Sequence, residues 1–105
     1  MAEGLGLERD LAIEVMGGTP AGRGHMSTTY PARVLRGDLS PAFMIDLAKK
    51  DLDIALQLSS TMGIPLSLAQ SAEKVYDAAQ VEGRGQQDWT AIYAMLRDKN
   101  VKSSA

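Results

Sequence analysis

Glycine and proline divide this sequence into segments whose apolar residues recur every three or four positions, which is the spacing of one helix face. The spacing predicts helices over about residues 8–16, 26–36 and 41–62, from 67 to the glycine at 83, and from 89 to about 97. The second helix should be short or bent, because Pro31 lies inside it. No segment alternates apolar and polar residues as a paired strand would. We therefore expect an all-α fold, a compact bundle of about five helices.

Helix boundaries are predicted from capping residues. Glycines at 37, 63 and 83 are expected to end the second, third and fourth helices. Three side chains are expected to begin helices, namely Ser40 ahead of Pro41, Ser67 in a capping box with Gln70, and Asp88.

Length and composition indicate a single small globular domain over residues 1–105, with residues 98–105 as a frayed tail. Hydrophobic residues make up 45% and charged residues 23%, and the net charge of −2 gives no electrostatic reason to expect a nucleic-acid partner. No apolar run approaches the roughly 20 residues that span a bilayer, and the N-terminus lacks the pattern of a signal peptide, so we expect a cytoplasmic protein without a membrane partner. Without cysteine, and with His25 as the single histidine, we expect no metal site.

The predicted helices need a shared core. Its expected members are large apolar residues at helical spacing: Leu47, Ile54, Leu58, Leu68, Val75, Trp89 and Ile92.

The stretch "FMIDLAKKDLDIAL", residues 43–56, is an amphipathic helix whose apolar side carries charge. On a helical wheel centred on Leu47, Lys49 lies on the opposite side and is assigned to solvent. Lys50 lies at the margin of the apolar arc, about 60° from Leu47, and Asp51 lies inside it at about 40°. A buried carboxylate needs a cation, N–H donors or water.

Two interpretations of this charged pair stay open at this point. In the first, Asp51 caps a neighbouring helix or pairs with Arg33 or Arg36, and Lys50 extends to water. In the second, the two charges form a polar notch that binds a small polar ligand. The spacing alone does not separate them.

Several features occur in an order that resembles a known family. They are "GD" followed by a proline and a phenylalanine, then "KDLDIAL" in a long helix, "GIPL", a helix with a tyrosine and an alanine, and "GRGQQDW" before a last apolar helix. Together they resemble the C-terminal helical domain of the β-hydroxyacid dehydrogenases, the 3-hydroxyisobutyrate dehydrogenase and tartronate semialdehyde reductase group, which is related to 6-phosphogluconate dehydrogenase. The resemblance covers about residues 5–97.

The resemblance implies an oxidoreductase that moves a hydride between NAD(P) and a small β-hydroxyacid or its semialdehyde. It places Phe43, Lys50 and Asp51 at the substrate and cofactor cleft. Lys50 would supply positive charge near a carboxylate or the cofactor, Asp51 would orient polar neighbours, and Phe43 would line the pocket.

The nucleotide-binding features of this family are absent from the sequence. No G-x-G-x-x-G occurs, and the two "GRG" stretches, at 22–24 and 83–85, are interpreted as loop glycines. The long helix that carries the family's catalytic lysine is also missing, since the chain starts about where that helix should end. We therefore expect no catalytic residue in this chain, no cofactor bound by the chain alone, and no dehydrogenase activity from it alone.

Three functional hypotheses follow. The chain is a C-terminal substrate-cleft and dimerisation domain without its Rossmann domain, or a stand-alone helical dimerisation or binding module, or a subunit completed in trans by a nucleotide-binding chain. Apolar helix faces without a covering layer predict a homodimer.

Overall fold

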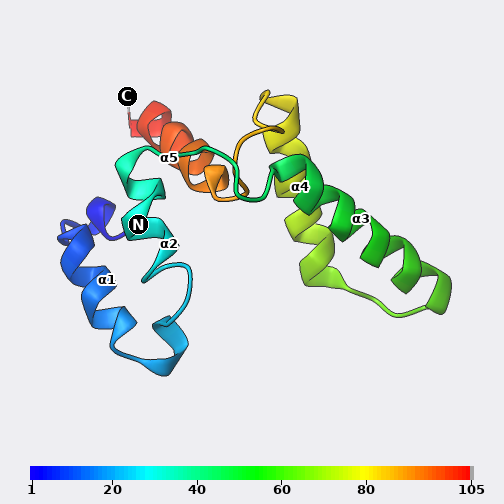
Figure 1. Cartoon of the computed structure of the whole chain (residues 1–105), viewed down its shortest axis with the longest axis horizontal. Coiled ribbons are helices and arrows are strands. Elements are labelled where there is room, and N and C mark those ends of the chain that lie inside the picture. Colours follow the sequence, from blue (N-terminus) through cyan, green and yellow to red (C-terminus); the bar gives the residue numbers. More distant parts are fainter. Residues whose placement is uncertain (105) are drawn as a thin grey trace. The chain divides into compact units, whose positions relative to one another are not determined.

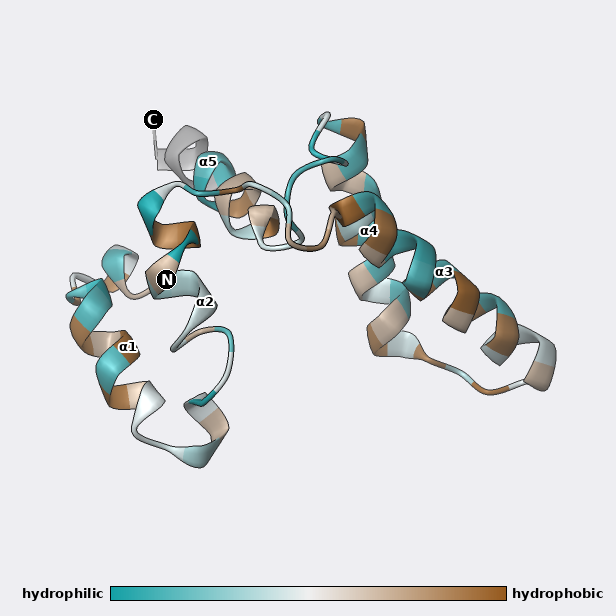
Figure 2. Ribbon diagram, viewed as in Figure 1, coloured by the Kyte–Doolittle hydropathy of each residue, from teal (hydrophilic) through white to brown (hydrophobic). Residues whose placement is uncertain are grey.

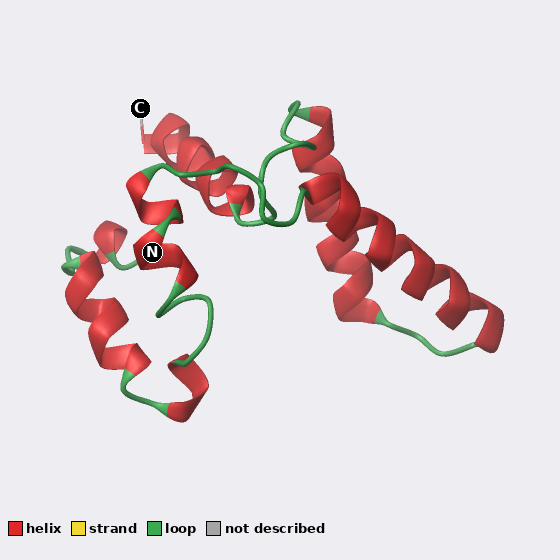
Figure 3. Cartoon of the chain, viewed as in Figure 1, coloured by secondary structure: helices red, strands yellow, loops and turns green. Residues whose placement is uncertain are grey.

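The structure, a computed structural model, describes the backbone of residues 1–104 and the side chains of residues 1–99. These residues form five α-helices and three 3-10 helices, and residues 1–104 contain no strand (Figures 1 and 3). The all-α prediction is confirmed. Contacts along the chain divide it into two compact units, Met1–Asp38 and Leu39–Ala105, and each is described by itself. The single domain over residues 1–105 stays a prediction.

The first unit contains short helices. They are η1 (Glu3–Leu5), α1 (Arg9–Gly17), η2 (Pro20–Gly22), α2 (Thr29–Ala32) and η3 (Val34–Arg36). Helix α1 matches the predicted segment 8–16. The predicted helix over 26–36 is divided into α2 and η3, because the backbone at Arg33 leaves the helical region. Pro31 lies in the first turn of α2, where its missing N–H is not needed. Gly37 ends η3 in the left-handed conformation, with φ of 83°.

The second unit contains the three long helices, α3 (Ile45–Met62), α4 (Ser67–Val81) and α5 (Ala91–Ser104). Helices α3 and α4 lie side by side as a hairpin, and Gly63 ends α3 with φ of 70° (Figure 1). The core of this unit lies where the start of α3 meets the end of α4 and the start of α5. It consists of Ile45, Ala79, Ala91 and Met95, with Leu39, Tyr76 and Ile92 packed against it.

The predicted core is wrong for most of its members. Ile92 packs against the core and Trp89 is half-buried, but five others are exposed, from 37% for Leu47 to 88% for Leu68: Leu47, Ile54, Leu58, Leu68 and Val75. The residues of α3 that face inward are instead Ile45, Ala48 and Ser59, with Leu52 and Leu56 half-buried between them. Helix α3 therefore has apolar residues on two faces, one against α4 and one exposed (Figure 2).

Lys49 was assigned to solvent by the wheel, and that assignment is also wrong. Its side chain is only 17% exposed and forms an ion pair with Glu73 of α4. The hydrogen bonds and ion pairs of Lys49 make this burial favourable, because its charge is matched by two carboxylates.

Two of the predicted side-chain caps, Ser40 and Ser67, are not used. Helix α3 begins at Ile45 rather than after Ser40, and α4 begins at Ser67 itself without a side-chain cap. At α3 the first two N–H groups donate to backbone carbonyls far along the chain, from Ile45 to Gln87 and from Asp46 to Gly85. These carbonyls satisfy donors that a helix leaves unpaired at its start. Helix α5 begins at Ala91 and continues past the predicted end near Arg97 to Ser104.

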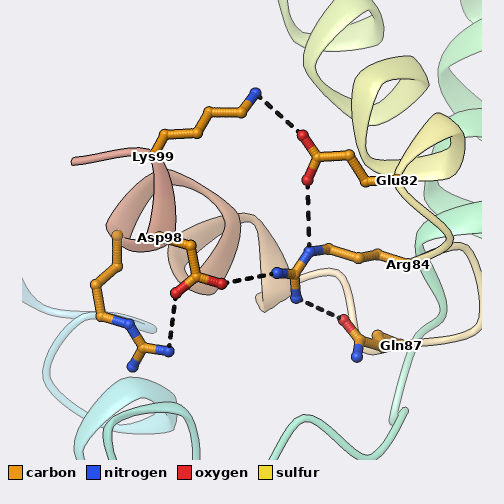
Figure 4. A network of polar contacts seen from close by, with 6 residues as sticks. Glu82, Arg84, Gln87, Asp98 and Lys99 are labelled. Carbon is orange, nitrogen blue, oxygen red and sulfur yellow. Dashed lines mark hydrogen bonds and ion pairs between the residues drawn. The ribbon is translucent and has the colours of Figure 1, made fainter. Parts of the chain in front are cut away.

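Arg84 joins the end of α4 to α5 (Figure 4). Its guanidinium lies 3.0 Å from Asp98 Oδ2 of α5 and 3.8 Å from Glu82 Oε2, and it donates to Gln87 Oε1 at 3.1 Å. A third ion pair, Lys99 to Glu82 at 3.3 Å, shares the Glu82 carboxylate with Arg84. None of the helices that residues 1–104 form is both long enough and apolar enough to cross a bilayer.

Candidate functional site

Lys50 and Asp51 lie on the exposed side of α3. Their side chains are 60% and 61% exposed, and Lys50 Nζ lies 3.7 Å from Asp51 Oδ1. Asp51 pairs with its neighbour Lys50, and Arg33 pairs with Asp38 of its own unit. A pairing of Asp51 with Arg33 or Arg36, which belong to the other unit, stays a prediction. An ion pair this exposed contributes about 0–1 kcal/mol to stability, so both charges can reorient toward another group at little cost.

The surroundings of this ion pair are apolar although exposed. We call this surface the outer face of α3 and define it by Leu47, Asp51, Ile54 and Leu58, with Lys50 at its margin. Phe43 lies two residues before the first residue of α3 and is also exposed. A cation among apolar side chains attracts an anion more strongly once another surface covers it, because the effective dielectric constant falls. The arrangement is therefore suited to binding a small anionic group at the edge of an apolar surface.

A loop of the second unit fixes the segment that carries Phe43. We call it the clamp loop and define it as residues 85–89. The Phe43 N–H donates to Asp88 Oδ1 at 3.0 Å, and the Trp89 N–H donates to the Phe43 carbonyl at 2.8 Å. In the same loop, the carbonyls of Gly85 and Gln87 accept hydrogen bonds from the first two N–H groups of α3. The clamp loop therefore sets the position of Phe43 and the start of the helix that carries Lys50.

Gly85 lets the clamp loop approach α3 this closely. A Cβ atom at this position would overlap the carboxylate of Asp46, which accepts a hydrogen bond from Gln80 Nε2 at 2.7 Å. The "GRG" at 83–85 lies in the turn after α4, as the sequence predicts, and Gly83 is left-handed there with φ of 84°. The "GRG" at 22–24 starts at the last residue of η2. Along residues 1–104 neither stretch follows a strand.

Asp88 was predicted only as a helix cap and has a larger role. Its side chain is 2% exposed and accepts hydrogen bonds from the Ala42, Phe43 and Thr90 amides and from the Thr90 hydroxyl. Burial pushes the pKa of this carboxyl upward, but the hydrogen bonds from Thr90, Phe43 and Ala42 outweigh it and hold the pKa below its usual value. Burial, with the Asp88 charge, raises the pKa of Tyr76. Local sequence gave no sign of this role, because the partners at 42 and 43 lie far away in the chain.

Comparison with known proteins assigns the family. Residues 1–96 match the NAD-binding family of NADP-dependent 3-hydroxyisobutyrate dehydrogenase. The chain belongs to this family of dehydrogenases. The predicted resemblance is confirmed.

Curated relatives match the chain over part of their length. The chain is 50% identical to the 3-sulfolactaldehyde reductase of Escherichia coli over 97 residues, which are 92% of this chain and 33% of that protein. It is 33% identical to a probable mitochondrial 3-hydroxyisobutyrate dehydrogenase of Dictyostelium discoideum over 77% of this chain and 24% of that protein. The chain thus spans about a third or less of the curated relatives it matches.

Solved structures agree with the fold. A 3-hydroxyisobutyrate dehydrogenase from Salmonella typhimurium superposes with a TM-score of 0.77 at 26% identity, over 90% of this chain and 33% of that one. The enzyme of the same name from Mycobacterium tuberculosis, solved with L-serine, gives 0.76 at 26% identity, over 91% and 35%. The helical fold of this chain is therefore that of one region of these dehydrogenases.

Proposed function

We propose that this chain is the C-terminal substrate-cleft and dimerisation domain of an NAD(P)-dependent β-hydroxyacid dehydrogenase. The observation that carries the proposal is the outer face of α3, where Lys50 and Asp51 are exposed among apolar side chains. Phe43 is also exposed, and its backbone N–H is bonded to Asp88. A surface of this kind suits a cleft wall, because its apolar part excludes water and its charge selects an ionic ligand.

In this proposal each of the three residues has a role in binding. Lys50 binds an anionic group of the substrate or the cofactor, because a fixed cation in a confined site stabilises negative charge. Asp51 orients Lys50, its ion-pair partner at 3.7 Å, and Phe43 lines the pocket. Relatives are named for 3-sulfolactaldehyde, L-threonate and 3-hydroxyisobutyrate, and each of these compounds carries an acid group. We therefore propose a small anionic aldehyde or its alcohol as the substrate class.

We also propose that these 105 residues alone bind no NAD(P) and catalyse no hydride transfer. The family's cofactor site uses a glycine-rich turn between a strand and a helix, and residues 1–104 contain no strand. The test mixes the purified chain with NADH or NADPH and a panel of semialdehydes that includes 3-sulfolactaldehyde. Cofactor oxidation above that of the Lys50→Ala variant would contradict the proposal.

The exposed apolar residues support self-association as the chain's mode of assembly. In the chain alone, where no nucleotide-binding domain faces the outer face of α3, the exposed Leu47, Ile54 and Leu58 could be buried by a second copy of the chain in a symmetric contact. We expect a homodimer by light scattering at micromolar concentration. A monomeric mass at that concentration would count against the dimer.

The same exposed surface supports a second candidate, a subunit that a separate nucleotide-binding chain completes in trans. A pull-down from the source cell separates completion in trans from the other two hypotheses, a domain without its Rossmann domain and a stand-alone module. Recovery of a Rossmann-fold chain would favour completion in trans, whereas recovery of this chain alone as an inactive dimer would favour one of the other two hypotheses.

A further inference from the structure

Phe43 lies on a stretch that has no regular secondary structure of its own. Residues 39–43 precede α3 and make no helical hydrogen-bond pattern. The position of the Phe43 ring therefore depends on contacts with the rest of the second unit. Those contacts come from the clamp loop, through hydrogen bonds to Leu39, Ala42 and Phe43.

Asp88 makes several of these contacts. Its Oδ1 accepts both successive amides of the stretch, from Ala42 at 3.0 Å and from Phe43 at 3.0 Å. Its Oδ2 accepts the Thr90 amide at 3.2 Å and the Thr90 hydroxyl. The Asp88 N–H donates to the Leu39 carbonyl at 3.0 Å. The residue thus holds the stretch at both ends.

The chemistry of these contacts requires a short carboxylate. Each carboxylate oxygen can accept two hydrogen bonds, and Asp88 receives two on each oxygen. Asparagine offers one acceptor oxygen and presents an NH₂ group to the Thr90 amide, which is itself a donor. Buried donors left without an acceptor are costly, so the stretch would move to find other partners.

We propose that Asp88 is a positioning residue that fixes the Phe43 ring as one wall of the substrate cleft. This inference rests on the proposed function for its use, because Phe43 lines a cleft only if α3 faces one. The positioning of Phe43 by Asp88 is tested on the 105-residue chain without any enzyme activity. A failure of the positioning is therefore distinguished from a failure of the proposed cleft function.

Fluorine NMR gives a direct test, because Phe43 is the single phenylalanine in the sequence. The chain is made with fluorophenylalanine, which gives one resonance that reports the Phe43 ring alone. We expect one narrow line, displaced from that of the free amino acid. In Asp88→Ala and Asp88→Asn the line should broaden, split or move toward the free position while circular dichroism shows the helices intact.

Asp98→Asn is the matched control. Asp98 is also a carboxylate with hydrogen bonds, at 3.0 Å to Arg84, but it does not touch the stretch that carries Phe43. Its variant should leave the fluorine line unchanged. If Asp88→Ala unfolds the chain, the fluorine line of Asp88→Asn tests the proposal. A line that stays unchanged in folded Asp88→Asn, or that changes as much in Asp98→Asn, would overturn the proposal.

Discussion

Lys49 of α3 and Glu73 of α4 form an ion pair, with Lys49 Nζ 3.4 Å from Glu73 Oε1. Lys49 also pairs with Asp53, at 2.7 Å, one turn further along α3. The neighbouring Lys50, about 100° around the helix, is exposed. Two adjacent lysines thus have different surroundings, because Lys49 links α3 to α4 and Lys50 is exposed.

Replacing each lysine by methionine should separate their contributions to stability. Methionine keeps an apolar stem and removes the charge. Lys49→Met should lower the urea midpoint of unfolding, since it leaves Glu73 and Asp53 without their cation inside the hairpin. Lys50→Met should leave the midpoint nearly unchanged, because its ion pair is exposed. Equal midpoints for the two variants would show that Lys49 does not join the helices.

The contribution of Lys49 should depend on pH in the alkaline range. The hydrogen bond to Asp53 raises the pKa of Lys49, burial opposes it, and Glu73 adds to the rise, so the folded pKa lies above 10.5. A raised lysine pKa means that its stabilisation is fully present below pH 10.5 and is lost as pH rises through the folded pKa. The difference in urea midpoint between the wild type and Lys49→Met should therefore shrink above pH 10.5. A difference that stays constant there would contradict this.

Gly85→Ala tests the close approach of the clamp loop to α3. The new Cβ would overlap the Asp46 carboxylate, the end of an exposed side chain that can turn aside, so we expect the loss of its hydrogen bond to Gln80 and a fall of about 0.5–1 kcal/mol in the free energy of unfolding. Gly4→Ala is the control, because nothing lies within 4 Å of a Cβ there. In an Asp46→Ala background the cost of Gly85→Ala should fall, since the two sites are in contact. If the losses in unfolding free energy for Gly85→Ala and Asp46→Ala simply add in the double variant, the new Cβ does not overlap the Asp46 carboxylate.

Asp88 should make the fold sensitive to acid. Burial raises its pKa, but the hydrogen bonds from Thr90, Phe43 and Ala42 lower it more, so the folded pKa lies below 3.8. A depressed carboxyl pKa means that the stabilisation is present above pH 3.8 and is lost as pH falls through the folded pKa. At neutral pH, Asp88→Asn should lower the free energy of unfolding by about 2 kcal/mol. The thermal unfolding midpoints of the wild type and the variant should become equal only below pH 3.8. Equal midpoints at a higher pH would contradict this prediction.

The features of the fold that could be predicted from sequence are those set by local chemistry. Helical spacing gave the all-α class, and the glycines at 37 and 63 end their helices in the left-handed conformation, as predicted. The start of α3 could not be predicted locally, because its first N–H groups are satisfied by carbonyls at 85 and 87. No residue near Ser40 signals such a contact.

The orientation of α3 could not be predicted for a different reason. The wheel placed Leu47 at the centre of the buried side, whereas Ile45 and Ala48 are buried and Leu47 is exposed. A helix with apolar residues on two faces has no unique inner side on a wheel, and small residues such as Ala48 allow the closer packing. For the same reason the wheel shows that Lys50 and Asp51 lie on or near an apolar side of the helix, but it does not show that this side is exposed. Asp88 was missed as a positioning residue, since its partners lie far away in the sequence.

A chimeric enzyme tests the central claim most directly. In the 3-sulfolactaldehyde reductase of Escherichia coli, the third that matches this chain is replaced by this chain, and reduction of 3-sulfolactaldehyde is followed through cofactor oxidation. We predict an active chimera in which Lys50→Ala lowers kcat/KM by about tenfold or more, because it removes a cation from the cleft. The matched variant Lys74→Ala, at an exposed lysine of α4, should leave kcat/KM unchanged. Equal kcat/KM for the Lys50→Ala and Lys74→Ala chimeras would contradict the claim that the outer face of α3 is the wall of the cleft.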